Sequence, residues 1–413
     1  MLKALHAKID DPNVIRVYVA TLGLGTAYGM AISVISVFLN ERGFSETDIG
    51  SLAAWFAGGI MAMAIASDYL VKKLSAKVVL VGALFTYATT VALFPFAPGY
   101  AAMSALRFVD GAASVCVWVA SETILLARAR RAIKAFITSI YAMSIAVGYG
   151  AGSGMAYLAA DVLPSARTFL VASAITIVTA IFTLLKLDRS SDAHREEAAG
   201  HEGAGEASGA KAPLGVLIGR IKASCFATFA YGYFQSSVVL FLPLFMASEK
   251  GIPKAQTRLI TFFFAGGMLL ATNVAGRLGD RYGHLLMMRR LAIVGAAMIA
   301  SFVWLNGLPM MALAVFVAGA SLASISPLSL ALQGLVTREY SRATSVYNAF
   351  YAAGMLLGPP ISSYIYQMRG GGPMLYHLAA LWAAFIVFAQ IFRRDDPAVG
   401  RAPEPRLPVP AAD

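Results

Sequence analysis

The chain has 413 residues, of which 58% are hydrophobic and only 13% are charged. A soluble domain carries about 25% charged residues, so this composition excludes a protein that faces water on all sides. The mean hydropathy of +0.69 extends over nearly the whole sequence, which indicates many membrane spans rather than a soluble body with one anchor.

Twelve apolar stretches are long enough to cross a bilayer, since about 20 helical residues span its hydrocarbon core. They predict an all-α membrane protein with twelve transmembrane helices. In chain order the predicted spans are 14–39, 49–66, 78–96, 100–127, 135–160, 167–187, 223–247, 258–278, 291–305, 310–336, 344–366 and 375–392.

The basic residues predict the orientation. Of the 33 Lys and Arg residues, 26 lie on the side of both termini, 6 lie in loops of the opposite side, and Arg107 lies inside a span. Because basic loops resist translocation, we expect a multi-pass protein of the cytoplasmic (inner) membrane with both termini in the cytoplasm. The net charge of +11 is thus explained by topology, and the scattered clusters argue against a nucleic-acid partner.

A hydrophilic stretch divides the chain into two halves. Residues 188–222 include Glu196, Glu197 and His201 among small residues, and such a composition cannot bury a core. We predict a first six-helix bundle at 1–187, a cytoplasmic linker at 188–222, a second bundle at 223–392 and a disordered cytoplasmic tail at 393–413. The apolar end of the linker, 214–220, fits either a surface helix or an early start of the seventh span.

An internal repeat supports two pseudo-symmetric bundles. The sequence TSIYA at 138–142 matches TSVYN at 344–348, an offset of 206 residues. At the same offset, Gly148 and Gly152 align with Gly354 and Gly358. Both segments open the fifth span of their half, which indicates a duplicated six-helix unit.

Residues 276–284 read GRLGDRYGH between the eighth and ninth predicted spans. Glycine allows a neighbouring helix to approach, and the Asp280 carboxylate can cap a helix N-terminus or pair with an arginine. The stretch resembles the signature loop of the major facilitator superfamily, G-x-x-x-D-R-x-G, with Gly276, Asp280, Arg281 and Gly283 in the family's positions. The resemblance implies the fold of that family and a latch for its cytoplasmic gate, whereas the residues alone also fit a charged turn.

The equivalent loop of the first half keeps less of this pattern. Asp68 and the basic pair Lys72 and Lys73 are present, but Val71 replaces a glycine and Tyr69 replaces the arginine after the acid. Asp68 is therefore our second predicted gate residue.

The fourth span contains three charges, Arg107, Asp110 and Glu122. A charge inside hydrocarbon costs at least about 2.5–3.5 kcal/mol, so these side chains should face a wet cavity or one another. Arg107 with Gly111 also resembles the R-x-x-x-G pattern of the family's fourth helix, where the arginine is associated with proton coupling. We therefore predict proton coupling by Arg107, Asp110 and Glu122, while an i,i+3 ion pair and snorkelling of Glu122 remain structural alternatives.

Polar residues inside the spans predict the substrate cavity, because polar groups in the membrane need partners that water or a solute can supply. Any one of them could instead bond to a neighbouring helix. The predicted cavity residues are Tyr28, Trp118, Tyr231, Gln235, Asn273, Tyr347 and Asn348.

Two departures from the antiporters of the family argue against multidrug export. Ser153 stands in the glycine-rich fifth span where those proteins have proline, and Gly358, Pro359 and Pro360 occur in the eleventh span instead. The first span also contains no acidic residue.

The sequence contains no pattern of an enzyme or a metal site. The five histidines form no HExxH motif, no GxSxG motif or P-loop occurs, and the two cysteines, Cys116 and Cys225, lie far apart inside apolar runs. We expect no cofactor and no metal.

These observations predict a monomeric, proton-linked secondary transporter that works by alternating access and exports a small amphipathic metabolite or drug-like solute. One alternative is an importer of a sugar-like or organic-acid solute. The other is a receptor or assembly factor that has the transporter fold and transports nothing.

Overall fold

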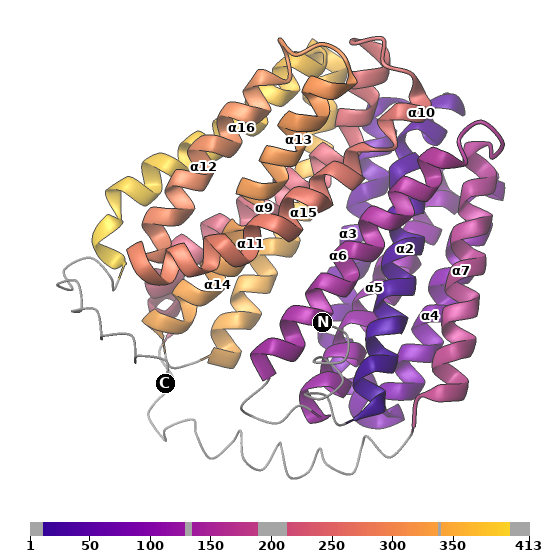
Figure 1. The fold of residues 1–413 in the computed structure, drawn as a ribbon, viewed down its shortest axis with the longest axis horizontal. Coiled ribbons are helices and arrows are strands. Elements are labelled where there is room, and N and C mark those ends of the chain that lie inside the picture. The colour runs from indigo at the N-terminus through magenta and orange to yellow at the C-terminus, as the bar shows by residue number, and fades with distance from the viewer. Residues whose placement is uncertain (1–10, 129–133, 189–212, 338–339, 397–413) are drawn as a thin grey trace, which may run out of the picture.

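The computed structural model describes residues 11–128, 134–188, 213–337 and 340–396, and in these ranges the secondary structure is entirely helical (Figure 1). Most of the predicted linker and tail lies outside the described residues. Short helices are α10 (Lys254–Thr257), η1 (Phe94–Phe96) and η4 (Arg393–Asp395).

The long helices form two bundles. The first half consists of α2 (Pro12–Glu41), α3 (Glu46–Leu74), α4 (Ala76–Leu93), α5 (Tyr100–Arg128), α6 (Lys134–Leu158) and α7 (Ser165–Lys186). The second half consists of α9 (Leu214–Ser248), α11 (Ile260–Tyr282), α12 (His284–Ser301), α13 (Leu308–Leu322), α14 (Ile325–Val336), α15 (Tyr340–Arg369) and α16 (Gly371–Ile391).

Within the described ranges, nine helical segments are long and apolar enough to cross a membrane by length and composition. The helices α3, α6 and α15 are not among the nine, although they pack inside the same bundles against α5, α2 and α9. The architecture is the all-α membrane fold that the sequence predicts.

Several helix boundaries differ from the predicted ones. The seventh helix begins at Leu214 inside the predicted linker and continues across a kink at Ile221 (φ −104°, ψ 15°), so the apolar end of the linker is an early start of this helix. The tenth predicted span is divided into α13 and α14 at residues 323–324. The predicted tail begins with an ordered turn, in which the buried Asp396 carboxylate accepts a hydrogen bond from the Leu285 amide (2.9 Å).

In each half, a glycine allows two neighbouring helices to pack closely, and the helix pairs of the two halves are equivalent. A β-carbon on Gly111 of α5 would meet the carbonyl oxygen of Phe56 on α3. In the second half, a β-carbon on Gly319 of α13 would meet the carbonyl oxygen of Phe264 on α11. Small residues allow this backbone-to-backbone packing in membranes, and it occurs at equivalent places in both halves.

The glycines of the sequence repeat behave in the same way. Gly152 of α6 lies against the carbonyl oxygen of Thr26 on α2, and Gly358 of α15 lies against that of Tyr233 on α9. The predicted alignment of Gly152 with Gly358 is therefore confirmed, because the two glycines pack the same helix pair of their respective halves.

The two halves meet at the side opposite the chain termini and diverge toward the side at which α2 begins (Figure 1). At the closed side Lys254 Nζ lies 3.1 Å from Glu41 Oε1, and Thr47 Oγ1 donates a hydrogen bond to Gln367 Oε1 (2.6 Å). Arg16 and Asp188, at the start of α2 and just after α7, form an ion pair (2.9 Å) on the terminal side. The first half of the chain therefore begins and ends on the same side, which requires an even number of membrane crossings between Arg16 and Asp188. The predicted six spans agree with this.

Candidate substrate site

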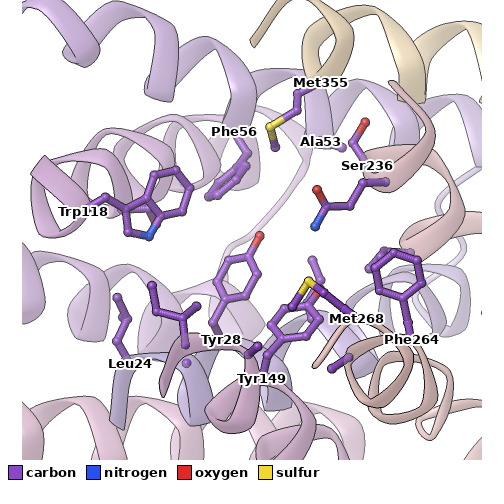
Figure 2. Close-up of a pocket in the computed structure, with 18 of the residues that line it drawn as sticks. Leu24, Tyr28, Ala53, Phe56, Trp118, Tyr149, Ser236, Phe264, Met268 and Met355 are labelled. Carbon is purple, nitrogen blue, oxygen red and sulfur yellow. The ribbon is translucent and has the colours of Figure 1, made fainter. Parts of the chain in front are cut away.

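A central cavity lies between the two halves, with about 1240 Å³ of empty space when the part open to solvent is included. Figure 2 shows Tyr28, Phe56, Trp118 and Met355 directed toward this common space. The lining residues come from α2, α3, α5, α6, α9, α11 and α15, and they include Tyr28, Phe56, Arg107, Ser114, Trp118, Tyr149, Gln235, Ser236, Phe264, Met268, Tyr351 and Met355.

Aromatic rings dominate the cavity wall. The rings of Tyr28 and Tyr149 stack with centroids 5.5 Å apart and planes at 29°. On the other half, Tyr351 stacks on Tyr231 (6.2 Å, 26°), and its hydroxyl donates a hydrogen bond to Gln235 Oε1 (2.9 Å). The site therefore offers flat apolar surfaces with a few polar groups at their edges, an arrangement that suits an amphipathic solute.

Arg107 and Asp110 form a buried ion pair in the wall of the cavity. Their side chains are 8% and 6% exposed, and the Arg107 guanidinium lies 4.3 Å from the centre of the Phe56 ring. The predicted i,i+3 pair is therefore present. Arg107 Nε and Asp110 Oδ1 have no hydrogen-bond partner among the described residues, and an unpaired buried polar atom is costly inside a protein.

A second, small cavity lies behind the ion pair. Arg107 lines both the central and the small cavity, whereas Asp110 lines only the small one, together with Tyr28, Tyr87 and Thr90. Arg107 is thus placed between the central cavity and its own counter-ion.

Glu122, the third predicted coupling residue, lies apart from this pair. It is 12 residues beyond Asp110 on α5, or about 18 Å along the helix axis, and its side chain is exposed. On the same helix Ser114 and Trp118 line the cavity, whereas Gly111 packs against α3.

The structure places three of the seven predicted cavity residues in the lining, namely Tyr28, Trp118 and Gln235. Tyr231 is not in the lining but stacks on Tyr351, which is. Asn273 and Asn348 are exposed outside the lining. The Tyr347 hydroxyl bonds to the hydroxyl of Ser329 (2.9 Å), so this tyrosine packs α15 against α14 and does not face the central cavity.

Sequence reasoning missed much of the aromatic lining. Phe56, Tyr149, Phe264 and Tyr351 were not predicted, because an apolar or aromatic residue in a span is normally packing material. One signal was available, since Tyr149 lies in the glycine-rich segment of the fifth span, where the helix approaches α2 closely.

The predicted gate residues lie on the terminal side. Gly276, Asp280 and Arg281 belong to the last turns of α11, and only Gly283, at φ 101°, forms the turn to α12. The predicted loop is thus mostly helical, because a helix can continue beyond the hydrocarbon. The Asp280 side chain is 76% exposed, and its Oδ1 lies 3.2 Å from Nε2 of His284, the first residue of α12. Asp68 lies in α3 of the first half.

A buried arginine joins the halves on the opposite side. Arg258, between α10 and α11, is 8% exposed and donates hydrogen bonds to the Ala156 carbonyl oxygen (2.8 Å) and to Ser165 Oγ (3.5 Å). In return, the Ser153 hydroxyl donates to the Arg258 carbonyl oxygen. The serine that replaces the family's proline therefore makes a contact between the two halves.

Two helical bundles that enclose a central cavity, in contact on one side and apart on the other, are the arrangement of a secondary transporter of the alternating-access type. The chain belongs to the Major Facilitator Superfamily, whose family model matches residues 17–222 and 224–412. No curated protein sequence matches the chain.

Solved structures of transporters have the same fold. The nucleoside transporter NupG is 14% identical, with a TM-score of 0.74 over 93% of this chain and 100% of that chain. The human organic anion transporter MFSD10 (TETRAN) is 15% identical, with a TM-score of 0.67 over 92% and 100% of the two chains. A bacterial homologue of the human lysosomal transporter Spinster, inward-facing and occupied, is 12% identical with a TM-score of 0.72 over 93% and 97%. The family and these structures are those of transporters rather than enzymes.

Proposed function

We propose that this chain is a proton-linked secondary transporter that moves a small amphipathic solute across the cytoplasmic membrane by alternating access. The observation that carries the proposal is the Arg107–Asp110 pair, which is buried in the wall of a cavity shared by both halves. A carboxylate in this position changes its surroundings when the halves rearrange, and its affinity for a proton changes with them. Proton binding and cavity access are then linked.

The cavity lining also bears on the solute and the direction of transport. A sugar would require many hydrogen-bonding groups, whereas aromatic and aliphatic side chains predominate here. Export of an amphipathic solute is the direction that we predict from the sequence. Import of an organic acid is a second candidate, which the position of Arg107 in the lining favours.

Proton-driven uptake and counterflow in proteoliposomes test this proposal. Asp110→Asn and Glu122→Gln should each abolish transport driven by a pH gradient, because neither replacement can take up a proton. Counterflow of labelled against unlabelled solute, which needs no net proton movement, should persist in both variants. Undiminished pH-driven transport in both would contradict proton coupling by these residues, and the absence of counterflow by the wild-type chain would favour the receptor alternative.

A further inference from the structure

The charges of the central cavity are unbalanced. Among the described residues that line it, Arg107 is the one with a formal charge, and no Asp or Glu is present in that lining. Asp110 is excluded from the cavity because it lies behind Arg107. An organic cation would thus find no counter-charge, while an anion would meet a guanidinium.

Several polar groups at the cavity surface can donate hydrogen bonds to a solute. Gln235 uses its carbonyl oxygen to accept from Tyr351, which leaves its amide NH2 as the donor toward a solute. Trp118 contributes an indole N–H, and Tyr28 and Tyr149 contribute hydroxyl groups. A solute rich in acceptor oxygens suits this arrangement.

Arg107 has unused binding capacity. Its Nη1 pairs with Asp110, but its Nε is buried and has no partner in the part of the chain that the structure describes, and the same holds for Asp110 Oδ1. A guanidinium has five N–H donors in a fixed plane and binds carboxylates in a bidentate manner. The stacked pair Tyr28 and Tyr149 and the ring of Phe56 provide flat surfaces beside it.

From these observations we propose that the solute is an organic monoanion with a flat apolar body, and that its carboxylate replaces Asp110 on Arg107. This inference rests on the proposed transport function and names its substrate class. When the solute binds, Asp110 loses its counter-ion in a buried site, where an unpaired carboxylate is very unfavourable. Asp110 then takes up one proton from hydronium in the aqueous solution. An O–H bond forms on its carboxyl group, a water molecule is released from the hydronium, and the solute itself is not changed covalently.

The surroundings of Asp110 allow this exchange. The titratable groups that line the small cavity with it are Arg107 on its own helix, Tyr28 on α2 and Tyr87 on α4, and α3 contributes the ring of Phe56 beside the guanidinium. None of them is a second acid, so the proton goes to Asp110. Anion and proton therefore occupy the site together and travel in the same direction. The proton gradient of a cytoplasmic membrane would then drive the anion inward, which favours the second candidate, import of an organic acid, over export.

Matched probes test the substrate class on the purified full-length chain. 2-Naphthoate, 2-naphthamide and 2-naphthylmethylammonium share a flat body and differ in charge. We expect naphthoate to quench the tryptophan fluorescence on binding, the amide to bind at least about tenfold more weakly, and the ammonium ion not to bind. In weak buffer at mildly alkaline pH, naphthoate should be bound together with about one proton per chain, as the replacement of a single carboxylate on Arg107 requires.

Variants separate this exchange from a structural role of the pair. Asp110→Asn should bind naphthoate at least as tightly as the wild type without proton uptake, because the competing carboxylate is gone. Arg107→Gln combined with Asp110→Asn leaves no buried charge that could prevent folding, and it should lose the discrimination between naphthoate and its amide. Arg167→Gln, at an exposed arginine outside the cavity, should retain both binding and proton uptake.

Three results would overturn the inference: equal binding of naphthoate and naphthamide, no binding of naphthoate, or proton uptake that persists in Asp110→Asn. Transport of a neutral or cationic solute driven by a pH gradient would also overturn it while the proposed transport function stands. Conversely, naphthoate binding with proton uptake but without transport in proteoliposomes would support the site and contradict the transport function.

Discussion

Gly111 holds the charged wall of the cavity in place. It lies one helical turn after Arg107 on α5, and a β-carbon at this position would overlap the Phe56 carbonyl oxygen of α3. Because Phe56 also supports the Arg107 guanidinium through its ring, the separation of α3 and α5 fixes the position of the charge. The R-x-x-x-G pattern thus has a packing reason in addition to the role that the family resemblance implies.

We expect Gly111→Ala to destabilise the chain by about 1–3 kcal/mol, since the added methyl group forces two backbones apart. Thermal unfolding in detergent measures this, with a thiol-reactive fluorophore that labels the buried Cys116 and Cys225 as they become exposed.

Gly82→Ala is the matched control for Gly111→Ala, because Gly82 is also inside a helix but has no atom within 4 Å of an added β-carbon. Here alanine should stabilise the helix by about 0.5–1 kcal/mol. Equal unfolding temperatures for the two variants would contradict the packing role of Gly111.

At the level of elements, the junction of α10 and α11 closes the side opposite the termini. Arg258 reaches α6 and α7 of the other half and is almost completely buried, whereas the neighbouring pair of Lys254 and Glu41 is about half exposed. An exposed ion pair contributes about 0–1 kcal/mol, while hydrogen bonds from a buried charged group contribute about 1.5–3 kcal/mol. Arg258 is therefore the stronger contact between the halves.

The two halves alternate between a state open on the terminal side and a state open on the opposite side. We expect Arg258→Gln to favour the state open on the opposite side by about 10- to 100-fold in the equilibrium constant. Lys254→Gln, which removes the exposed pair, should shift it far less. Spin labels at the exposed positions Val162 and Pro253, one on each half, measure the change as a longer distance between labels. A distance distribution that is the same in Arg258→Gln and the wild type would exclude a latch at this junction.

Across the whole molecule, the signature segment and Arg258 lie on opposite sides of the cavity. In this structure the halves diverge on the terminal side (Figure 1), and the exposed Asp280 pairs only locally with His284. A latch role for Asp280 therefore belongs to the other state, in which the terminal side is closed. The Arg258 contacts and a latch at Asp280 should therefore have opposite effects on the equilibrium between the two states, each of which is open on one side.

We predict that Asp280→Asn favours the state seen here, by loss of a charge-assisted contact worth about 1.5–3 kcal/mol. Cysteine pairs across the terminal side of the two halves should then crosslink more slowly than in the wild type. The double variant with Arg258→Gln should return toward the wild-type rate, since the two losses oppose each other. Unchanged crosslinking in Asp280→Asn would show that this segment is a charged turn without a gating role.

The cavity shows why the site was only partly predictable. Tyr28, Trp118 and Gln235 were found because a polar group in an apolar span needs a partner. The same rule selected Tyr347, whose partner is Ser329 of a neighbouring helix, and Asn273, which is exposed outside the lining. The rule identifies polar residues correctly, but the rotation of each helix about its axis decides what they face.

The sequence by itself determined the membrane location of the chain, the division into two halves, the repeat of Gly152 at Gly358 and the local pair of Arg107 with Asp110. These features depend on composition and on spacings within one helix or between repeated segments. Only the tertiary structure decided that Arg107 faces the cavity with Asp110 behind it. It also decided that aromatic rings from both halves line this cavity, and that Arg258 joins the halves on the side opposite the termini. Those relations depend on how helices far apart in sequence pack against each other, and hydrophobicity in a bilayer specifies neither their rotation nor their neighbours.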